Sequence, residues 1–542
     1  MRSRAIIAAA LVFTFVAACS SGSASSRAGT KPKATTSVYD TAPPREGGVL
    51  TVGLDAETDG WNPVASQWSG PGYAVGAAIF DPLIAGGNDN KAHPYLAQSV
   101  TPDRSYMHWT IKLRPNIKFH DGERLNADAL MLQFSKIKQS FVTSQLFGPM
   151  ANVAKVDDLT IRVNMSQPWV AFPEALASQA GYIAAPKQLR ASPEEAAKHP
   201  IGTGPYIFDS WQRDDHFTAT KNPNYWQRGL PHPAKIVFRV IPDQQTRIAA
   251  LQSGQIDYTY TGDASQILQF RGDKSVTLVE QPLDRPGFIM LNTAAAPLDD
   301  VRVRQALAYA TDAPQILQTL GRNIGSVADG PYRPASPWYV PSGYPTAPNV
   351  ARARGLLDDY KRSKGVTGNV KITVGCTPVG NNQQMVDLLK AQWAKAGIDV
   401  SEKMTEQATY INDTISGHYQ ANCWTQFGSP DPDIDTTWWI STNANPIGAV
   451  ALNFTRLKDA QIDADLKQAR ENPDFKVRKA AYGRVWKRFA ALVPYVWTTR
   501  GELAFLWNKR LHVVGIKLPD GADYAPPDKA GAAVPLAGVW VS

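Results

Sequence analysis

The chain has 542 residues, of which 43% are hydrophobic, and 56 Lys and Arg residues against 48 Asp and Glu residues give a net charge of +8. A chain of this length exceeds the size at which one hydrophobic core keeps growing, so we expect two or three domains. The small positive excess is spread along the chain, whereas nucleic-acid binding needs a concentrated patch, so composition argues against a nucleic acid as partner.

The N-terminus predicts an export signal, over residues 1–18. An apolar run from residue 5 to residue 18 follows Arg2 and Arg4, and it is too short to span a bilayer, which needs about 20 residues. The run ends in Val-Ala-Ala-Cys19, which resembles a bacterial lipobox and implies cleavage before Cys19 and lipidation of its thiol. An ordinary secretory signal with a chance cysteine is the alternative.

A flexible tether is expected next, over residues 19–45. Residues 20–36 are rich in Ser, Ala, Gly, Lys and Thr and contain no large apolar side chain, so they cannot bury enough surface to fold. No later stretch approaches 18 consecutive apolar residues, so no membrane span is expected beyond the anchor. The sequence therefore predicts an exported protein held by lipid on the outer, or periplasm-facing, side of the cell membrane.

The first expected strands have alternating apolar residues. Residues 47–54 predict the first strand of the folded body, and residues 109–113 and 159–163 predict strands of a smaller α+β unit. Residues 206–208 and 217–220 flank a polar turn, which indicates a hairpin.

The later pattern is βαβ. Residues 371–374 predict a strand, residues 385–393 carry apolar side chains at helical spacing, and residues 398–400 predict another strand. This order favours a parallel sheet. Before it, Asp299 or Asp300 is expected to cap a helix whose apolar face includes Leu307.

No catalytic motif is found. The sequence lacks Gly-x-Ser-x-Gly, the P-loop and His-Glu-x-x-His, so no catalytic residue, cofactor or metal is expected. Residues 202–204 lack the third glycine of a dinucleotide fingerprint and predict a turn. Asp431, Asp433 and Asp435 alternate, but the glycine and the glutamate of a calcium loop are missing. We interpret them as a solvated or capping acidic loop.

Cysteine usage leaves two alternatives open. Of three cysteines, Cys376 and Cys423 remain after lipidation of Cys19. An exported chain permits a disulfide between them, and two separate buried thiols are the other interpretation.

Aromatic residues in loops predict a ligand cleft. Trp109 and Trp393 are in phase with their elements and are expected in the core, whereas others fall among Gly, Pro and polar residues. Aromatic rings in loops offer apolar area with a polar handle, which suits a cleft. The candidates for ligand contact are Trp61, Trp68, Ser69, Trp424, Gln426, Phe427 and Gly428.

Five segments carry a family resemblance, which extends from about residue 47 to the C-terminus. They are Gly-Gly-Val-Leu (47–50), Leu-Arg-Pro-Asn-Ile-Lys-Phe-His-Asp-Gly (113–122), Gly-Thr-Gly-Pro-Tyr (202–206), Asn-Pro-Asn-Tyr-Trp (222–226) and Asp-Val-Arg-Val-Arg-Gln-Ala-Leu (300–307). The chain resembles the family 5 extracellular solute-binding proteins of ABC importers, which include dipeptide-, oligopeptide- and nickel-binding proteins.

The resemblance implies an α/β, two-lobed periplasmic-binding-protein-like clamp of type II, in the three-domain cluster C form, with hinge strands between the lobes. Closure of the lobes would bury the ligand. The implied first lobe comprises residues 46–82, 200–292 and 500–542, an extra small domain comprises 83–199, and the second lobe comprises 293–499. Most shared motifs are expected to be architectural.

The chain departs from dipeptide-binding members at both charged anchors. The aspartate that receives a peptide amine in those members corresponds here to Phe427 or Gly428, and the arginine that holds the carboxylate corresponds to Cys376. Losing both anchors should cost a free dipeptide several kcal/mol, which predicts weak binding of ordinary dipeptides. Asp431 or Asp433 could act as a substitute acid.

The resemblance implies a monomeric receptor that delivers its ligand to ABC permease and ATPase subunits. The ligand is expected to be an oligopeptide held through its backbone or another organic solute stacked on aromatic residues. One alternative is a receptor for an oligosaccharide or another uncharged solute, and a second is a transport-inactive homologue that regulates the envelope. A secreted hydrolase is disfavoured, because no pair of positioned carboxylates is found.

Overall fold

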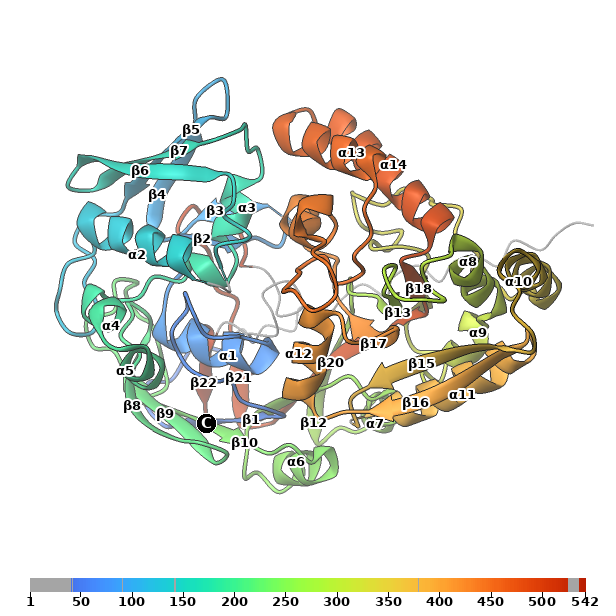
Figure 1. The fold of residues 1–542 in the computed structure, drawn as a ribbon. Helices are drawn as coiled ribbons and strands as arrows, with labels where there is room; N and C mark the ends of the chain where they lie inside the picture. Colours follow the sequence, from blue (N-terminus) through green and yellow to red (C-terminus); the bar gives the residue numbers. More distant parts are fainter. Residues whose placement is uncertain (1–39, 41, 90, 141–142, 379, 525–535) are drawn as a thin grey trace, which may run out of the picture. The chain divides into compact units, whose positions relative to one another are not determined.

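The computed structural model of the protein describes residue 40 and residues 42–89, 91–140, 143–378, 380–524 and 536–542. The expected leader, the lipidation site and most of the tether lie outside these residues. Tyr39–Ser542 forms one unit, and the elements labelled in Figure 1 belong to it.

A seven-stranded mixed sheet begins with the first expected strand. Strand β1 is parallel to its two neighbours, β10 and β11. On one side β10 pairs antiparallel with β9, and on the other side β11 pairs antiparallel with β20. The 206–220 hairpin is confirmed, because β8 pairs antiparallel with β9. In order across the sheet, the strands are β12 (Val276–Pro282), β20 (Glu502–Asn508), β11 (Tyr258–Thr261), β1 (Val49–Leu54), β10 (Lys235–Val240), β9 (His216–Lys221) and β8 (Tyr206–Gln212).

A five-stranded sheet contains the expected βαβ unit. Strand β15 is parallel to β16, with Val370 opposite Ile398, and helix α11 (Asn382–Ala394) connects them. The parallel pairing is therefore confirmed. In order, the strands are β16 (Ile398–Met404), β15 (Val370–Cys376), β17 (Ala421–Thr425), β13 (Gly287–Leu291) and β18 (Tyr495–Trp497).

The chain crosses from the first of these sheets to the second earlier than the expected boundary at residue 292. Strand β13 forms antiparallel ladders with β17 and β18, so Gly287–Leu291 belongs to the five-stranded sheet. The crossing thus lies between the end of β12 at Pro282 and Gly287. Backbone pairing determines which sheet contains β13. The apolar sequence of the strand alone does not predict this.

The four-stranded antiparallel sheet belongs to the expected smaller unit. Its order is β4 (Ala97–Pro102), β5 (His108–Leu113), β7 (Thr160–Met165) and β6 (Met150–Asp157). Three two-stranded pairs complete the strands: β2 (Ile84–Gly86) with β3 (Ala92–Pro94), β14 (Ser326–Val327) with β19 (Thr499–Arg500), and β21 (Leu511–Val513) with β22 (Val539–Val541).

Several helices begin at a short polar residue whose side chain caps them. Asp300 accepts a hydrogen bond from the Arg302 N–H at the start of α8, as expected, and Asn349 caps α10, which ends at left-handed Gly365. The helices are α1 (Gly70–Ile79), α2 (Ala127–Gln139), α3 (Phe172–Leu176), α4 (Pro186–Arg190), α5 (Pro193–Lys198), α6 (Gln244–Gln252), α7 (Ala264–Phe270), α8 (Val301–Ala310), α9 (Ala313–Thr319), α10 (Val350–Lys364), α11, α12 (Gln407–Ser416), α13 (Ala460–Glu471) and α14 (Phe475–Leu492). Short 3₁₀ segments include Pro432–Trp438.

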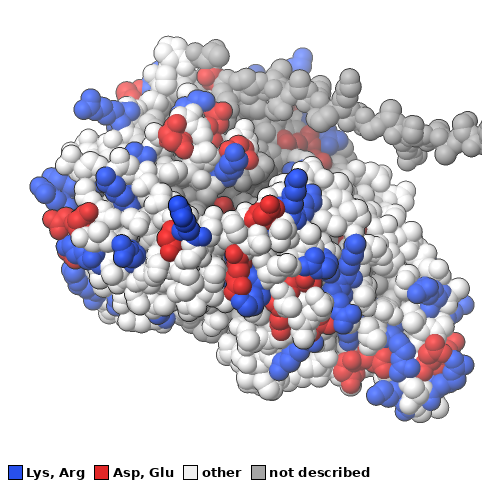
Figure 2. All heavy atoms as spheres, turned by 90° about the horizontal axis from the view of Figure 1, so that it is seen from above, with Lys and Arg blue, Asp and Glu red and all other residues white. Residues whose placement is uncertain are grey.

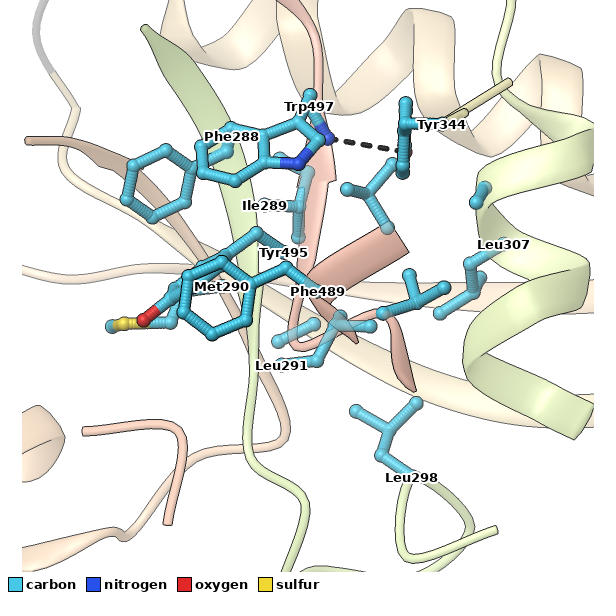
Figure 3. Close-up of a cluster of buried hydrophobic side chains, with 14 of the residues drawn as sticks. Phe288, Ile289, Met290, Leu291, Leu298, Leu307, Tyr344, Phe489, Tyr495 and Trp497 are labelled. Atoms are coloured by element: carbon cyan, nitrogen blue, oxygen red, sulfur yellow. Dashed lines mark hydrogen bonds between the residues drawn. The ribbon is translucent and has the colours of Figure 1, made fainter. Parts of the chain in front are cut away.

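Strand β13 is packed into an extensive hydrophobic cluster (Figure 3). Phe288 meets Trp497 edge-to-face, with ring centroids 5.2 Å apart, and the Trp497 backbone N–H donates to the Tyr344 hydroxyl at 3.1 Å. Trp393 and Trp109 are 0% and 3% exposed, which confirms their predicted place in the core.

The shared motifs around residues 202–226 are architectural, as expected. Buried Asp81 accepts hydrogen bonds from the hydroxyls of Thr203 and Tyr225 and from the indole N–H of Trp226, at 2.9–3.0 Å. Burial raises the pKa of Asp81 to about 6, against the lowering effect of these donors. A β-carbon at Gly204 would lie 2.6 Å from the Ile79 carbonyl oxygen, so the turn needs glycine there.

Candidate functional site

Two cavities lie between α1 and the loop that follows β17. Their volumes are about 930 Å³ and about 450 Å³, within the range of small-molecule sites. Both are lined by the start of α1, by the β12–β13 crossing and by the end of β17. The residues that line both are Trp68, Ser69, Tyr73, Ser178, Arg285, Thr425, Gln426, Ile434 and Asp435. Parts of the chain that are far apart in sequence thus form one continuous site.

Trp68 and Ser69 line both cavities from the N-terminal end of α1. The Trp68 indole N–H donates to the Gly60 carbonyl at 3.1 Å, and the side chain packs where a β-carbon at Gly76 would be. Because Trp68 is only 9% exposed, it forms the wall of the site and offers little of its ring face to a ligand.

Trp61 does not reach the site. It is 2% exposed and packs edge-to-face on Trp211 and Phe217, with centroids 5.4 and 4.8 Å away. It lines neither of the two cavities. Polar and proline neighbours in the sequence suggested an exposed loop, but the indole packs against aromatic residues of β8 and β9, which are distant in sequence.

Trp424 and Gln426 lie at the end of β17 and line the larger cavity. Trp424 is half-buried and stacks on Tyr410 at 5.7 Å, with Phe454 against its edge at 5.5 Å. Its indole N–H donates to the Gln426 side-chain oxygen at 3.0 Å. This hydrogen bond and the stacking hold the indole in place beside the cavity.

Phe427 and Gly428 stand where dipeptide-binding members carry an acid, and both line the smaller cavity. Phe427 has a φ of 76° and its ring stacks on Phe288 at 5.3 Å, so it is 6% exposed and belongs largely to the core. Gly428 has a φ of 81°, and a β-carbon there would lie 2.8 Å from the Asp284 backbone. The loop offers mainly backbone to a ligand.

A disulfide joins Cys376 and Cys423, whose Cα atoms are 5.1 Å apart. It links the end of β15 to β17, which are parallel neighbours. Cys376 is fully buried, whereas Cys423 lines the larger cavity, with Thr377 nearby on the same wall. At the position of the family's carboxylate-binding arginine, the cavity wall is therefore uncharged.

The acidic loop is buried, which corrects the expectation of solvation. Asp431, Asp433 and Asp435 are 3%, 0% and 4% exposed. Asp431 caps the 3₁₀ segment, as the alternative predicted, and pairs with Arg478 at 2.6 Å, while Asp433 pairs with Arg470 at 2.9 Å. Asp431 and Asp433 are therefore occupied by arginines and do not line the two cavities.

Asp435 is the member of this loop that reaches the site. The Ser429 hydroxyl donates to its carboxyl at 3.0 Å. Burial raises the pKa of Asp435 to about 7, with the hydrogen bonds from Ser429 acting in the opposite direction.

Comparison with known proteins identifies the family. The model of the bacterial extracellular solute-binding proteins, family 5, matches residues 91–447. The chain belongs to this family.

The chain is similar to peptide- and glutathione-binding proteins and to a solved structure of the same fold. The glutathione-binding protein GsiB of Pectobacterium atrosepticum is 26% identical over 81% of this chain and 86% of its own length. GsiB of Escherichia coli K12 is 30% identical over 53% of this chain and 56% of its own length. The oligopeptide-binding protein AppA of Bacillus subtilis, solved with a nonapeptide, is 21% identical over 92% of this chain and 100% of that chain, with a TM-score of 0.79. These likenesses confirm the α/β multi-domain clamp of a family 5 binding protein.

Sequence reasoning missed two charged residues of this site. Arg285 lies in the β12–β13 crossing and lines both cavities, and Glu174 lies in α3 and lines the smaller one. For Arg285 the sequence held no clear signal, because the strands on either side of it were not predicted. For Glu174 the sequence held none, because α3 meets the cavity only through the tertiary fold.

Neither a cluster of metal ligands nor a membrane-spanning helix occurs among the described residues. No group of three or more His, Cys, Asp or Glu side chains within them could hold a metal ion. None of their helices is long and apolar enough to cross a membrane. On the face drawn in Figure 2, basic and acidic side chains are mixed, without a large patch of either sign.

Proposed function

We propose that the protein is the lipid-anchored receptor of an ABC importer and that it captures a peptide or a related organic solute between two lobes. The observation that carries this proposal is the pair of cavities enclosed between helix α1, the end of β17 in the five-stranded sheet and the crossing that joins the two large sheets. Family membership supports solute binding. The names of the relatives, which include glutathione and a nonapeptide, favour a peptide-like ligand.

The proposed lobes follow the sheets. The first lobe comprises residues 46–82, 200–286 and 500–542, the small domain comprises residues 83–199, and the second lobe comprises residues 287–499. The boundary between the lobes lies at residue 286 and not at residue 292, because β13 pairs with strands of the second lobe. The two connections near residues 283–286 and 498–501 serve as the hinge, and rotation about them admits and releases the ligand. A permease and an ATPase complete the importer.

Ligand identity is the direct test of this proposal. The purified protein is denatured and its released small molecules are identified by mass spectrometry, and the stripped protein is then titrated with the compound found. We expect binding without turnover and a smaller radius of gyration in solution scattering when the compound is added. Chemical conversion of the compound by purified protein, or the absence of any bound or binding solute, would refute receptor function.

The lipid anchor is tested separately at Cys19. Cys19→Ala should abolish lipidation and leave the protein unprocessed or in the soluble fraction, whereas Cys376→Ala should leave membrane fractionation unchanged. A Cys19→Ala protein that is mature in size and fractionates with membranes contradicts the anchor and leaves the receptor proposal standing.

A further inference from the structure

Arg285 is a cation without a protein partner in the site. It lines both cavities and remains accessible, and no hydrogen bond or ion pair joins it to another of the described residues. The surrounding protein lowers its pKa by desolvation. A partly desolvated guanidinium binds a carboxylate well, since its planar fork matches the two oxygens.

Glu174 is the corresponding acid. It is half-buried and lines the smaller cavity, and among the residues that the structure describes its carboxyl has no hydrogen-bond or ion-pair partner from another residue. Burial raises its pKa to about 7, and repulsion from Asp431 and Asp433 adds to this effect, while Arg478 opposes it. An ammonium group of a ligand would relieve this unfavourable burial by supplying the missing positive charge.

The other charged groups in the smaller cavity are already engaged. Asp284 pairs with Arg333, and Asp435 accepts hydrogen bonds from Ser429. Lys91 is 77% exposed and lies 3.8 Å from Asp89, so solvent screens its charge. Within the described cavity walls, the half-buried Glu174 and the accessible Arg285 remain as the charges without a protein partner that a ligand can satisfy.

The distribution of Glu174, Arg285 and apolar side chains over the two cavities implies an orientation for the ligand. Glu174 lines only the smaller cavity, Arg285 lines both, and the larger cavity has Arg285 and Asp435 as its only charged residues in the described chain. The remaining wall of the larger cavity is mostly aromatic and aliphatic and includes Tyr410, Ile411, Trp424, Trp438, Leu452 and Phe454. A matching ligand therefore carries, in order, a cation, a carboxylate and an apolar group.

We propose that the ligand is a short peptide with a free amine and a bulky apolar residue at its carboxyl end, with the amine on Glu174, the carboxylate on Arg285 and the terminal side chain in the larger cavity. This inference rests on the proposed receptor function. It reverses the expectation of weak dipeptide binding. The two anchor positions of dipeptide-binding members are uncharged here, but Glu174 and Arg285 supply an acid and an arginine at other positions of the site. A ligand with two carboxylates and one amine would leave one carboxylate without an unpartnered cation in the described cavity walls.

The test uses four small probes and the stripped full-length protein. Isothermal titration compares Gly-Phe with Phe-Gly, with N-acetyl-Gly-Phe and with Gly-Phe amide. We expect Gly-Phe to bind most tightly, with both blocked derivatives weaker by thirty-fold or more, since each blocking group leaves one anchor, covered by the bound ligand, without its charged partner. Glutathione, added as a fifth compound, should bind more weakly than Gly-Phe.

Variants test which residue binds the amine of the peptide and which binds its carboxylate. Arg285→Gln should weaken Gly-Phe by thirty-fold or more and leave Gly-Phe amide unchanged, and Glu174→Gln should weaken Gly-Phe and leave N-acetyl-Gly-Phe unchanged. Lys91→Gln, which removes an exposed charge from the same cavity, is the matched control and should have little effect. A cooperative thermal unfolding transition shows that each variant is folded, and the Gly-Phe affinity of Arg285→Lys, which keeps the charge, should lie between those of Arg285→Gln and the natural protein.

The outcomes separate this inference from the proposed function. Equal binding of free and blocked peptides, or unchanged Gly-Phe affinity in Arg285→Gln, overturns the assignment of the anchors. If none of the peptides binds while a different solute copurifies, the peptide class is wrong and the receptor function stands. If no solute copurifies or binds, the receptor function itself fails.

Discussion

The indole N–H of Trp169 donates a 2.6 Å hydrogen bond to the Asp433 carboxylate, which lies 264 positions further along the chain. Trp169 belongs to the proposed small domain and Asp433 to the proposed second lobe. The Val170 N–H donates to the Arg470 carbonyl at 3.1 Å beside it, and Arg470 pairs with Asp433. These contacts join the proposed small domain to the proposed second lobe in the conformation seen here.

Trp169→Phe should therefore destabilise the ligand-bound, closed state. The phenylalanine ring keeps the aromatic packing on Phe147 and Phe172 but cannot donate to Asp433. Hydrogen bonds to charged groups contribute about 1.5–3 kcal/mol, so the affinity for the copurified ligand should fall about ten-fold or more. The ligand-induced decrease in the radius of gyration should need a correspondingly higher ligand concentration.

Trp109→Phe is the matched control for this prediction. Its indole N–H donates to the Trp169 carbonyl at 3.2 Å, inside the same small domain. Trp109→Phe should lower the free energy of unfolding, but it should weaken ligand binding less than Trp169→Phe does. Equal ligand affinity in Trp169→Phe and the natural protein would show that the hydrogen bond does not favour closure.

The disulfide should contribute to the stability of the second lobe. It closes a loop with a sequence separation of 47 between β15 and β17, and removing a crosslink of this kind typically costs about 2–4 kcal/mol. Cys376→Ser combined with Cys423→Ser should lower the urea midpoint accordingly. A reducing agent should destabilise the natural protein by a similar amount and leave the double variant unchanged. An unchanged midpoint in the double variant would contradict this contribution.

Local sequence signals predicted much of the fold. The strands at β1, β5 and β7, the 206–220 hairpin and the capped helix α8 all depend on apolar periodicity or on one capping residue, which are short-range properties. The parallel pair β15 and β16 followed from the βαβ order. The sheet to which β13 belongs was not predicted, because its partners β17 and β18 are more than 120 positions away.

The site was predicted less completely, for the same reason. The burial of Asp431 depends on Arg478, 47 positions later, and the sequence alone does not indicate that pair. Trp61 and Trp424 occupy similar polar loops in the sequence, yet one is in the core and the other lines the cavity. Arg285 and Glu174 become neighbours of one cavity only after the sheets are assembled.

Trp424 should contribute to ligand affinity through its half-buried ring. Trp424→Ala should weaken the copurified ligand by several-fold to tens-fold, because an aromatic contact contributes about 0.5–1.5 kcal/mol beyond the area that it buries. Trp424→Phe keeps the stacking on Tyr410 and should retain most of the affinity in isothermal titration. An alanine variant that binds as tightly as the natural protein would place the ligand elsewhere.

Glu174 should make the ligand-free protein less stable as the pH rises. Burial and the nearby Asp431 and Asp433 raise the pKa of Glu174 from an ordinary value of 4.5 to about 7, despite Arg478. A carboxyl with a raised pKa in the folded state contributes stability below about pH 4.5, and this contribution is lost as the pH rises through about 7, where the folded protein must hold a buried charge.

Glu174→Gln removes this ionisation, so its melting temperature should match that of the natural protein near pH 4 and exceed it at pH 8. Glu194→Gln is the control, because Glu194 is exposed and pairs with Lys198, and it should not show a gain at high pH. Scanning fluorimetry of ligand-free protein from pH 4 to pH 8 measures both. A bound peptide amine would satisfy the carboxylate and should shrink the difference at pH 8. A Glu174→Gln protein that is no more stable than the natural one at pH 8, with ligand absent, would show that ionisation of the buried Glu174 carboxyl does not destabilise the fold.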